Sequence, residues 1–153
     1  MQLTPASIQD ILSRFNIEAL NDMQVAALTI AAHQDWILHA DTGSGKTLAF
    51  LLPILSRLDP AIPGTQALVI APSRELAQQI EQVFKTMSTG FKVTCCYGGH
   101  LRETEENNLM EAPALIIGTP GRLADHIRRN NIQTAGILTL VLDEFDKSLE
   151  SGF

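Results

Sequence analysis

The chain has 153 residues, of which 45% are hydrophobic and 18% are charged, and its formal net charge at pH 7 is −6. This composition is typical of a globular protein with one core, and the negative charge argues against a protein that coats nucleic acid through bulk electrostatics. The sequence contains no apolar run long enough to cross a bilayer and no signal-peptide pattern at its start. We therefore expect one cytoplasmic domain over residues 1–153.

The two cysteines, Cys95 and Cys96, are neighbours in a stretch that we expect to be extended. Successive side chains of an extended chain point to opposite sides, so a disulfide between them is not expected. The four histidines are scattered along the chain, without the spacing of a zinc site. We expect two reduced thiols and no structural metal.

The first 30 residues carry two helical patterns. Thr4 and Pro5 suit the start of a helix, and the apolar residues that follow have the i, i+3, i+4, i+7 spacing of an amphipathic helix: Ile8, Ile11, Leu12 and Phe15. A second helix is expected to begin near Asn21 and Asp22.

Short apolar runs alternate with helical patterns in the rest of the chain. The apolar runs, typical of strands buried on both faces of a parallel sheet, cover residues 36–40, 67–71, 93–97, 114–117 and 138–142. The helical patterns cover residues 46–58, 74–87, 101–110 and 120–130. This order predicts an α/β fold, an open and mostly parallel sheet with helices on both faces. Pro53 is expected to bend its helix and to disfavour helical geometry at Leu52.

The segment ADTGSGKT, residues 40–47, follows the first predicted strand and opens a helix. It fits the phosphate-loop pattern GxxxxGK[ST], except that Ala40 replaces the first glycine. Backbone N–H groups of such a loop bind phosphates, Lys46 would neutralise the β- and γ-phosphates, and Thr47 would coordinate Mg²⁺. The alternative is a glycine turn with a solvated lysine. The expected nucleotide contacts in the loop are Thr42, Gly43, Ser44, Gly45, Lys46 and Thr47.

The last apolar run ends in four residues with three acids, Asp143-Glu144-Phe145-Asp146. At the carboxyl end of a strand, Asp143 would hold Mg²⁺ and Glu144 would polarise an attacking water. Taken alone, acidic residues after an apolar run are equally often only the solvated end of a strand. Together with a phosphate loop they indicate a nucleotide-hydrolysing site.

Five motifs in order resemble the first RecA-like domain of a DEAD-box ATP-dependent RNA helicase, a phosphate-loop NTPase domain: ADTGSGKT, PSREL (72–76), GG (98–99), TPGR (119–122) and DEFD (143–146). The resemblance runs from about Leu3 to Phe153. It implies ATP and Mg²⁺ as cofactors and catalytic roles for Lys46, Asp143 and Glu144. Gln24 stands where the family has a glutamine that reads adenine, although the family's Pro-Thr does not precede it.

The resemblance also implies that PSREL, GG and TPGR bind an RNA backbone, independently of base sequence. The residues implied in this contact are Ser73, Arg74, Gly98, Gly99, Thr119 and Arg122. Taken singly, these residues suit helix caps, a turn and surface arginines equally well. Phe145 stands where the family has an alanine.

In the family, a Ser-Ala-Thr motif on a further strand and a second RecA-like domain with arginines follow, and neither occurs in these residues. The resemblance implies a monomeric piece of a longer helicase, without membrane contact and nearly inactive alone. The alternatives are an ATP-dependent RNA clamp or scaffold, and a small-molecule kinase, in which PSREL and TPGR have no role.

Overall fold

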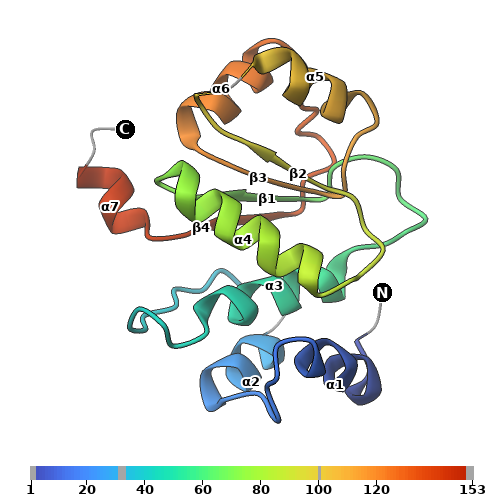
Figure 1. The fold of residues 1–153 in the computed structure, drawn as a ribbon, viewed down its shortest axis with the longest axis vertical. Coiled ribbons are helices and arrows are strands. Elements are labelled where there is room, and N and C mark those ends of the chain that lie inside the picture. The colour runs from blue at the N-terminus through green and yellow to red at the C-terminus, as the bar shows by residue number, and fades with distance from the viewer. Residues whose placement is uncertain (1–2, 31–33, 100, 151–153) are drawn as a thin grey trace.

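The computed structural model describes residues 3–30, 34–99 and 101–150, without the side chains of 148–150. Helices and strands alternate along most of the chain (Figure 1). In order they are α1 (Pro5–Ser13), α2 (Asp22–Thr29), α3 (Lys46–Arg57), β1 (Ala67–Ile70), α4 (Arg74–Thr86), β2 (Val93–Cys96), α5 (Arg102–Met110), β3 (Leu115–Gly118), α6 (Pro120–Arg128), β4 (Thr139–Leu142) and α7 (Phe145–Glu150).

The four strands form one parallel sheet in the order β2-β3-β1-β4. Their register aligns the last residues of all four strands: Cys96 pairs with Gly118, Gly118 with Ile70, and Ile70 with Leu142. The loops that follow the strands therefore leave the sheet side by side along one edge. The parallel α/β architecture expected from the sequence is confirmed.

Alternate residues of the strands supply two cores, one on each face of the sheet. Val69 and Ile117 pack with α1, α3 and α4, whereas Leu68 and Ile116 pack with Leu109 and other residues on the α5 and α6 side. Figure 1 shows α3 and α4 on one face and α5 and α6 on the other. Strands covered on both faces need apolar side chains at every position, which explains their continuous apolar runs.

Helix α3 is buried along most of its length, from Leu48 to Leu55. It continues through Pro53, and Leu52 stays helical, contrary to the sequence-based expectation. Tertiary packing on all sides of α3 offsets the hydrogen bond that proline cannot donate. Helices α1 and α2 lie outside α3 (Figure 1), and each begins with a capping box, formed by Thr4 and Ser7 in α1 and by Asn21 and Gln24 in α2.

The strand predicted at residues 36–40 is absent. These residues form no regular secondary structure, although side chains along them alternate between half-buried Trp36 and Leu38 and exposed Ile37 and His39. A strand requires a hydrogen-bonded neighbour, and the four paired strands of the described chain do not include this segment. The prediction of a strand buried on both faces is therefore wrong here, because the segment has no strand partner among the described residues and one of its sides is exposed.

Among the residues that the structure describes, no helix combines the length and apolar character needed to span a membrane.

Candidate functional site

The loop before α3 contains two glycines with positive φ angles and two hydrogen bonds within the loop. Gly43 and Gly45 have φ angles of +80° and +88°, in the left-handed region that favours glycine. The Ser44 hydroxyl donates to the Asp41 carbonyl at 2.6 Å, and Lys46 Nζ donates to the Ala40 carbonyl at 2.8 Å. The loop thus closes on itself at the N-terminus of α3, where backbone N–H groups lack helical partners.

Gln24 lies directly beneath this loop. Its side chain is 3% exposed, and its Nε2 donates to the Gly45 carbonyl at 3.2 Å. Its Oε1 accepts the backbone N–H of Asn21 at 3.0 Å, and Asn21 Nδ2 donates to the Ser44 carbonyl at 3.0 Å. Gly45 has a φ of +88°, which L side chains rarely adopt, and a Cβ there would lie 2.6 Å from Gln24 Nε2, so a substitution would strain the backbone and displace the Gln24 amide. Gln24 therefore supports the phosphate loop, and its predicted contact with adenine stays a prediction.

The acids after β4 also lie where the sequence predicts. The backbone N–H of Asp143 donates to the Ile70 carbonyl at 2.9 Å, which continues the sheet by one residue. Glu144 has a φ of 46°, its N–H donates to Asp143 Oδ1 at 3.1 Å, and its carboxylate pairs with Lys147 Nζ at 2.7 Å. Burial and the nearby Glu144 charge raise the pKa of Asp143, while Lys46 and Lys147 oppose this shift.

One cavity of about 1210 Å³ joins the loop to the acids. Its lining includes Thr42 and Lys46 of the loop segment and Asp143 and Glu144 after β4. Gln24 and Thr47 are not among the lining residues. The volume exceeds that of a typical small-molecule pocket, because the segment 34–42 does not pair with β4.

The donors near this cavity suit a hard divalent cation. Carboxylate and hydroxyl oxygens are the ligands that Mg²⁺ prefers, and Asp143 and Thr47 supply one of each. Burial is the main cause of the raised pKa of Asp143, and the adjacent Glu144 carboxylate adds to it, so a cation bound there would favour the charged form. The chemistry of these two oxygens fits Mg²⁺, and the assignment of Thr47 and Asp143 as the residues that would hold it stays a prediction.

The three loops predicted to bind RNA lie together at the aligned edge of the sheet. Backbone bonds connect their bases, from Thr119 N–H to the Cys96 carbonyl and from Ala71 N–H to the Gly118 carbonyl, each at 2.9 Å. A Cβ on Gly99 would lie 3.3 Å from Arg74 Nη1, so GG and PSREL are adjacent. Parallel strands in register explain why segments far apart in sequence form one surface.

The side chains of these loops differ in exposure. Ser73 and Arg74 are exposed; Ser73 caps α4 by accepting the Leu76 N–H, and Arg74 pairs with its neighbour Glu75 at 2.8 Å. Gly98 and Gly99 are also exposed, and Thr119 is half-buried. Arg122 is turned inward: its side chain is 15% exposed, and Nη1 lies 3.3 Å from Glu105 Oε2.

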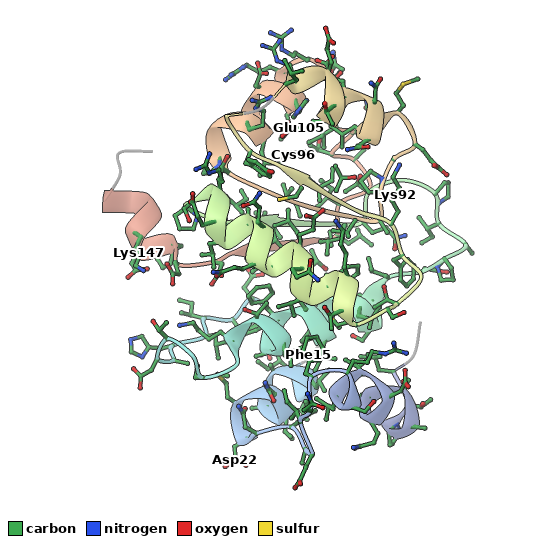
Figure 2. All side chains as sticks on the ribbon, viewed as in Figure 1. Phe15, Asp22, Lys92, Cys96, Glu105 and Lys147 are labelled. Atoms are coloured by element: carbon green, nitrogen blue, oxygen red, sulfur yellow. The ribbon has the colours of Figure 1, made fainter. Side chains whose placement is uncertain are left out.

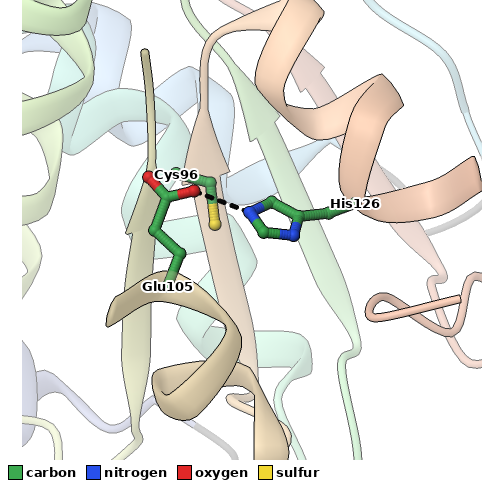
Figure 3. Close-up of side chains that lie close together, drawn as sticks. All are labelled: Cys96, Glu105 and His126. Atoms are coloured by element: carbon green, nitrogen blue, oxygen red, sulfur yellow. Dashed lines mark hydrogen bonds and ion pairs between the residues drawn. The ribbon is translucent and has the colours of Figure 1, made fainter. Parts of the chain in front are cut away.

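Two functional candidates, Glu105 and His126, were not found from the sequence. Both are buried, and His126 Nε2 lies 2.6 Å from Glu105 Oε2, with Cys96 beside them (Figure 3). Figure 2 shows Cys96 and Glu105 between the sheet and the α5 and α6 layer, well separated from Lys147 on α7. The only sequence signal was the i, i+4 spacing of Arg122 and His126, which places both on one face of α6.

The parallel sheet, the glycine loop before α3 and the acids after β4 define the class of this protein, a RecA-like domain with a phosphate loop. Residues 21–153 match the family described as DEAD/DEAH box helicase, and the chain belongs to that family. It corresponds to the N-terminal RecA-like domain of a DEAD-box protein.

Relatives and solved structures agree with this assignment. The chain is 37% identical to the ATP-dependent RNA helicase eIF4A of Neosartorya fischeri, an alignment that covers 100% of this chain and 39% of that protein. It is 44% identical to the ATP-dependent RNA helicase DeaD of Escherichia coli K12, over 74% of this chain and 19% of that protein. The chain therefore spans well under half of these relatives.

Two solved structures share the fold. A hypothetical ATP-dependent RNA helicase from Sulfolobus tokodaii superposes with a TM-score of 0.86 at 27% identity, over 98% of this chain and 44% of that chain. The yeast DEAD-box splicing factor Prp28 gives a TM-score of 0.87 at 32% identity, over 95% of this chain and 37% of that chain.

Proposed function

We propose that this chain is the ATP- and RNA-binding half of a cytoplasmic ATP-dependent RNA helicase, which remodels short RNA duplexes by ATP-driven closure of two RecA-like domains. The observation that carries this proposal is the shared edge of the sheet. The acids of the nucleotide cavity follow β4, and the PSREL, GG and TPGR loops follow β1, β2 and β3 at the same level. A structural change at the bound nucleotide would therefore occur close to the PSREL, GG and TPGR loops.

The proposed roles follow from the chemistry of the side chains. ATP supplies a γ-phosphate whose transfer to water releases the free energy for remodelling. Lys46 would bind the phosphates, Asp143 and Thr47 would hold Mg²⁺, and Glu144 would orient water. Ser73, Arg74, Gly98, Gly99, Thr119 and Arg122 would form the RNA surface, mainly through backbone phosphates.

The proposal includes a further strand and a second RecA-like domain outside these residues. Arginines of a partner domain contribute about 10³- to 10⁵-fold to phosphoryl transfer, so the 153-residue chain alone should hydrolyse ATP very slowly. We expect it to be monomeric and to bind Mg²⁺ and adenine nucleotide weakly. Robust duplex unwinding by these residues alone would contradict this part of the proposal.

The proposal is tested by the ATPase activity of the full-length protein, measured with and without RNA. Lys46→Ala should lower RNA-stimulated hydrolysis by about 10²-fold or more, because a charge that stabilises the transferred phosphoryl group is lost. Lys85→Ala is the matched control, since Lys85 is an exposed lysine on α4 paired only with Glu81 among the ion pairs seen. Equal activity of the Lys46→Ala variant and the wild type would refute the site.

An ATP-dependent RNA clamp is the second candidate, because all the proposed RNA contacts face the backbone and would hold RNA without separating strands. The two functions predict different behaviour of the full-length protein in a strand-separation assay. A helicase separates a short duplex on each ATP cycle, whereas a clamp retains single-stranded RNA in ATP and separates no strands.

A further inference from the structure

The buried carboxylate of Glu105 connects two of the proposed RNA loops. Its side chain is 1% exposed, and a buried carboxylate is costly unless donors surround it. Oε1 accepts the backbone N–H of Tyr97 at 2.8 Å, directly before Gly98 and Gly99. Oε2 lies 3.3 Å from Arg122 Nη1, in the TPGR segment. One side chain from α5 thus joins the GG loop to the start of α6.

His126 orients this carboxylate. It is 0% exposed, and its Nδ1 lies 3.1 Å from Asn131 Nδ2. Because an amide nitrogen can only donate, Nδ1 accepts, and Nε2 carries the hydrogen that is donated to Glu105 Oε2 at 2.6 Å. This bond, drawn in Figure 3, holds the Glu105 carboxylate, whose Oε1 accepts from Tyr97 and whose Oε2 pairs with Arg122.

Cys96, Glu105 and His126 also offer three ligand atoms within 4.8 Å of one another, the spacing of a metal site. The chemistry favours the ion-pair cluster instead. Burial, together with the nearby Glu105 charge, raises the pKa of the Cys96 thiol, and a metal would need the thiolate. The guanidinium of Arg122 beside Oε2 would repel a cation, and His126 Nε2 already donates its hydrogen.

The same network reaches the PSREL helix. The Tyr97 hydroxyl accepts from Gln78 Nε2 of α4 at 2.7 Å, and its backbone N–H donates to Glu105. Tyr97 therefore links Gln78 of α4, the helix that begins within PSREL at Arg74, to the carboxylate that pairs with Arg122. The side chains therefore connect the GG and TPGR segments through Glu105, and they reach the helix that begins within PSREL through Gln78.

We propose that Glu105 is a positioning residue for RNA, which sets the spacing of the GG and TPGR loops, with His126 as its orienting partner. The inference rests on the proposed function. Glu105 itself does not reach the surface, so it acts through Tyr97 and Arg122. Phosphates along an RNA strand have a fixed spacing, and loops that drift apart by a fraction of an ångström lose simultaneous contact with them.

The test compares Glu105→Ala, Glu105→Gln and the control Leu109→Ala in the full-length protein. Leu109 lies one turn further along α5 and is also buried, but it packs in the apolar core and makes no polar contact with either loop. Three quantities are measured for each variant: the Kd for a labelled single-stranded oligouridine RNA, the Kd for ADP, and the Tm.

Glu105→Ala should raise the RNA Kd by about tenfold and leave the ADP Kd unchanged, because only the RNA loops lose their spacing. Glu105→Gln should raise it by about threefold, since its amide oxygen still accepts from Tyr97 but cannot pair with Arg122. Because Glu105→Gln keeps the shape of the side chain, the RNA Kd can still be measured on this variant if Glu105→Ala unfolds. Leu109→Ala should lower the Tm and leave the RNA Kd at its wild-type value.

Two results would overturn the inference. One is a wild-type RNA Kd in both Glu105 variants. The other is an equal increase of the RNA Kd in Leu109→Ala, which would show a merely structural effect. If the wild-type protein binds no oligouridine at all, the proposed function fails, and this inference fails with it; wild-type binding with unaffected Glu105 variants overturns the inference alone.

Discussion

The two ends of the sheet differ in how completely the described residues enclose them. Toward the β2 end, Thr94 and Cys96 of β2 and Ile116 and Ile117 of the neighbouring strand β3 are buried. At β4, Leu140 is 58% exposed and Leu142 is 52% exposed, and a cavity separates the strand from residues 34–42. The end with the proposed RNA loops is thus held by contacts within this domain, whereas the nucleotide end is open.

This difference has a functional meaning under the proposal. Loops held by Glu105, Tyr97 and backbone bonds can present a preformed surface to RNA. The phosphate loop and the acids after β4 instead line one cavity, and under the proposal a further strand beside β4 would fix their relative positions. Nucleotide binding should therefore depend on residues beyond this chain more than RNA binding does.

The largest expected effect comes from a pair of substitutions in one row of the sheet. Ile116 and Leu140 both pair in register with Leu68. In the 153-residue chain, Ile116→Ala should lower the free energy of unfolding by about 2–5 kcal/mol, because it leaves a cavity in the core. Leu140→Ala should change it by less than about 0.5 kcal/mol, because most of that side chain is exposed. Denaturant unfolding measures both values.

The same pair sharpens the comparison in the full-length protein. If a further strand covers β4, Leu140→Ala should there cost about 2 kcal/mol or more, as for a buried leucine. The cost of Ile116→Ala should be the same in both proteins. A small cost for Leu140→Ala in the longer protein would show that β4 remains an open edge.

Gln24→Ala is expected to have the next largest effect. It removes the bonds to the Gly45 carbonyl and the Asn21 N–H, and it should lower the free energy of unfolding by about 1–3 kcal/mol. If Gln24 also reads adenine, the preference for ATP over GTP should fall, as measured by KM for each nucleotide in the full-length protein. Both the lower free energy of unfolding and the weaker preference for ATP would arise from contacts at the phosphate loop.

Gln9→Ala is the control for this prediction, since Gln9 Nε2 donates to the Glu18 carbonyl at the same 3.2 Å but at an exposed site. Its cost should stay below about 0.5 kcal/mol. If Gln24→Ala lowers the free energy of unfolding by no more than Gln9→Ala does, the result would contradict a supporting role of Gln24 beneath the phosphate loop.

How far the sequence predicted this molecule depends on whether a feature is local. The strand at 114–117 and the helix at 74–87 were predicted to within a residue or so, because apolar runs and helical periodicity follow from burial of each segment by itself. The segment 36–40 failed because pairing requires a neighbouring strand, which periodicity cannot report. The phosphate loop was predictable because its pattern is local: Gly43 and Gly45 adopt positive φ angles, which favour glycine at these positions.

The tertiary contacts of the site were not predictable in the same way. Arg122 was expected at the RNA surface, but its pairing with Glu105 depends on how α5 and α6 pack on the sheet. The adenine role assigned to Gln24 came from a position in the motif order, and no local pattern indicated that its amide would lie under Gly45. Side-chain partners between elements are set by packing, which a single sequence does not specify.

Arg74→Ala should change RNA binding but not stability. Its exposed ion pair with Glu75 contributes little to folding, so the Tm should stay within error of the wild type. If Arg74 contacts an RNA phosphate, the slope of log K against log salt concentration should fall by about 0.7 in magnitude. Arg14→Ala, which removes a comparably exposed arginine directly after α1, should leave that slope unchanged. An unchanged slope in Arg74→Ala would exclude a phosphate contact there.

The smallest expected change in stability near neutral pH concerns the Cys95 thiol of β2. Burial, with a smaller contribution from nearby Glu81 and Glu105, raises the pKa of Cys95 to about 12. At pH 8 the native thiol should therefore react with iodoacetamide on the order of 10³-fold more slowly than an unfolded cysteine, because only the thiolate is nucleophilic.

The sign of the linked stability change can also be checked. Between about pH 9 and pH 12 the unfolded chain loses the Cys95 proton before the folded chain does, so stability should fall as the pH rises, and Cys95→Ala should reduce that fall. Mass spectrometry after timed labelling at pH 8, with the denatured chain as control, measures the rates. Native labelling at the denatured rate would show that β2 opens readily, and the contrast between a closed RNA end and an open nucleotide end would be lost.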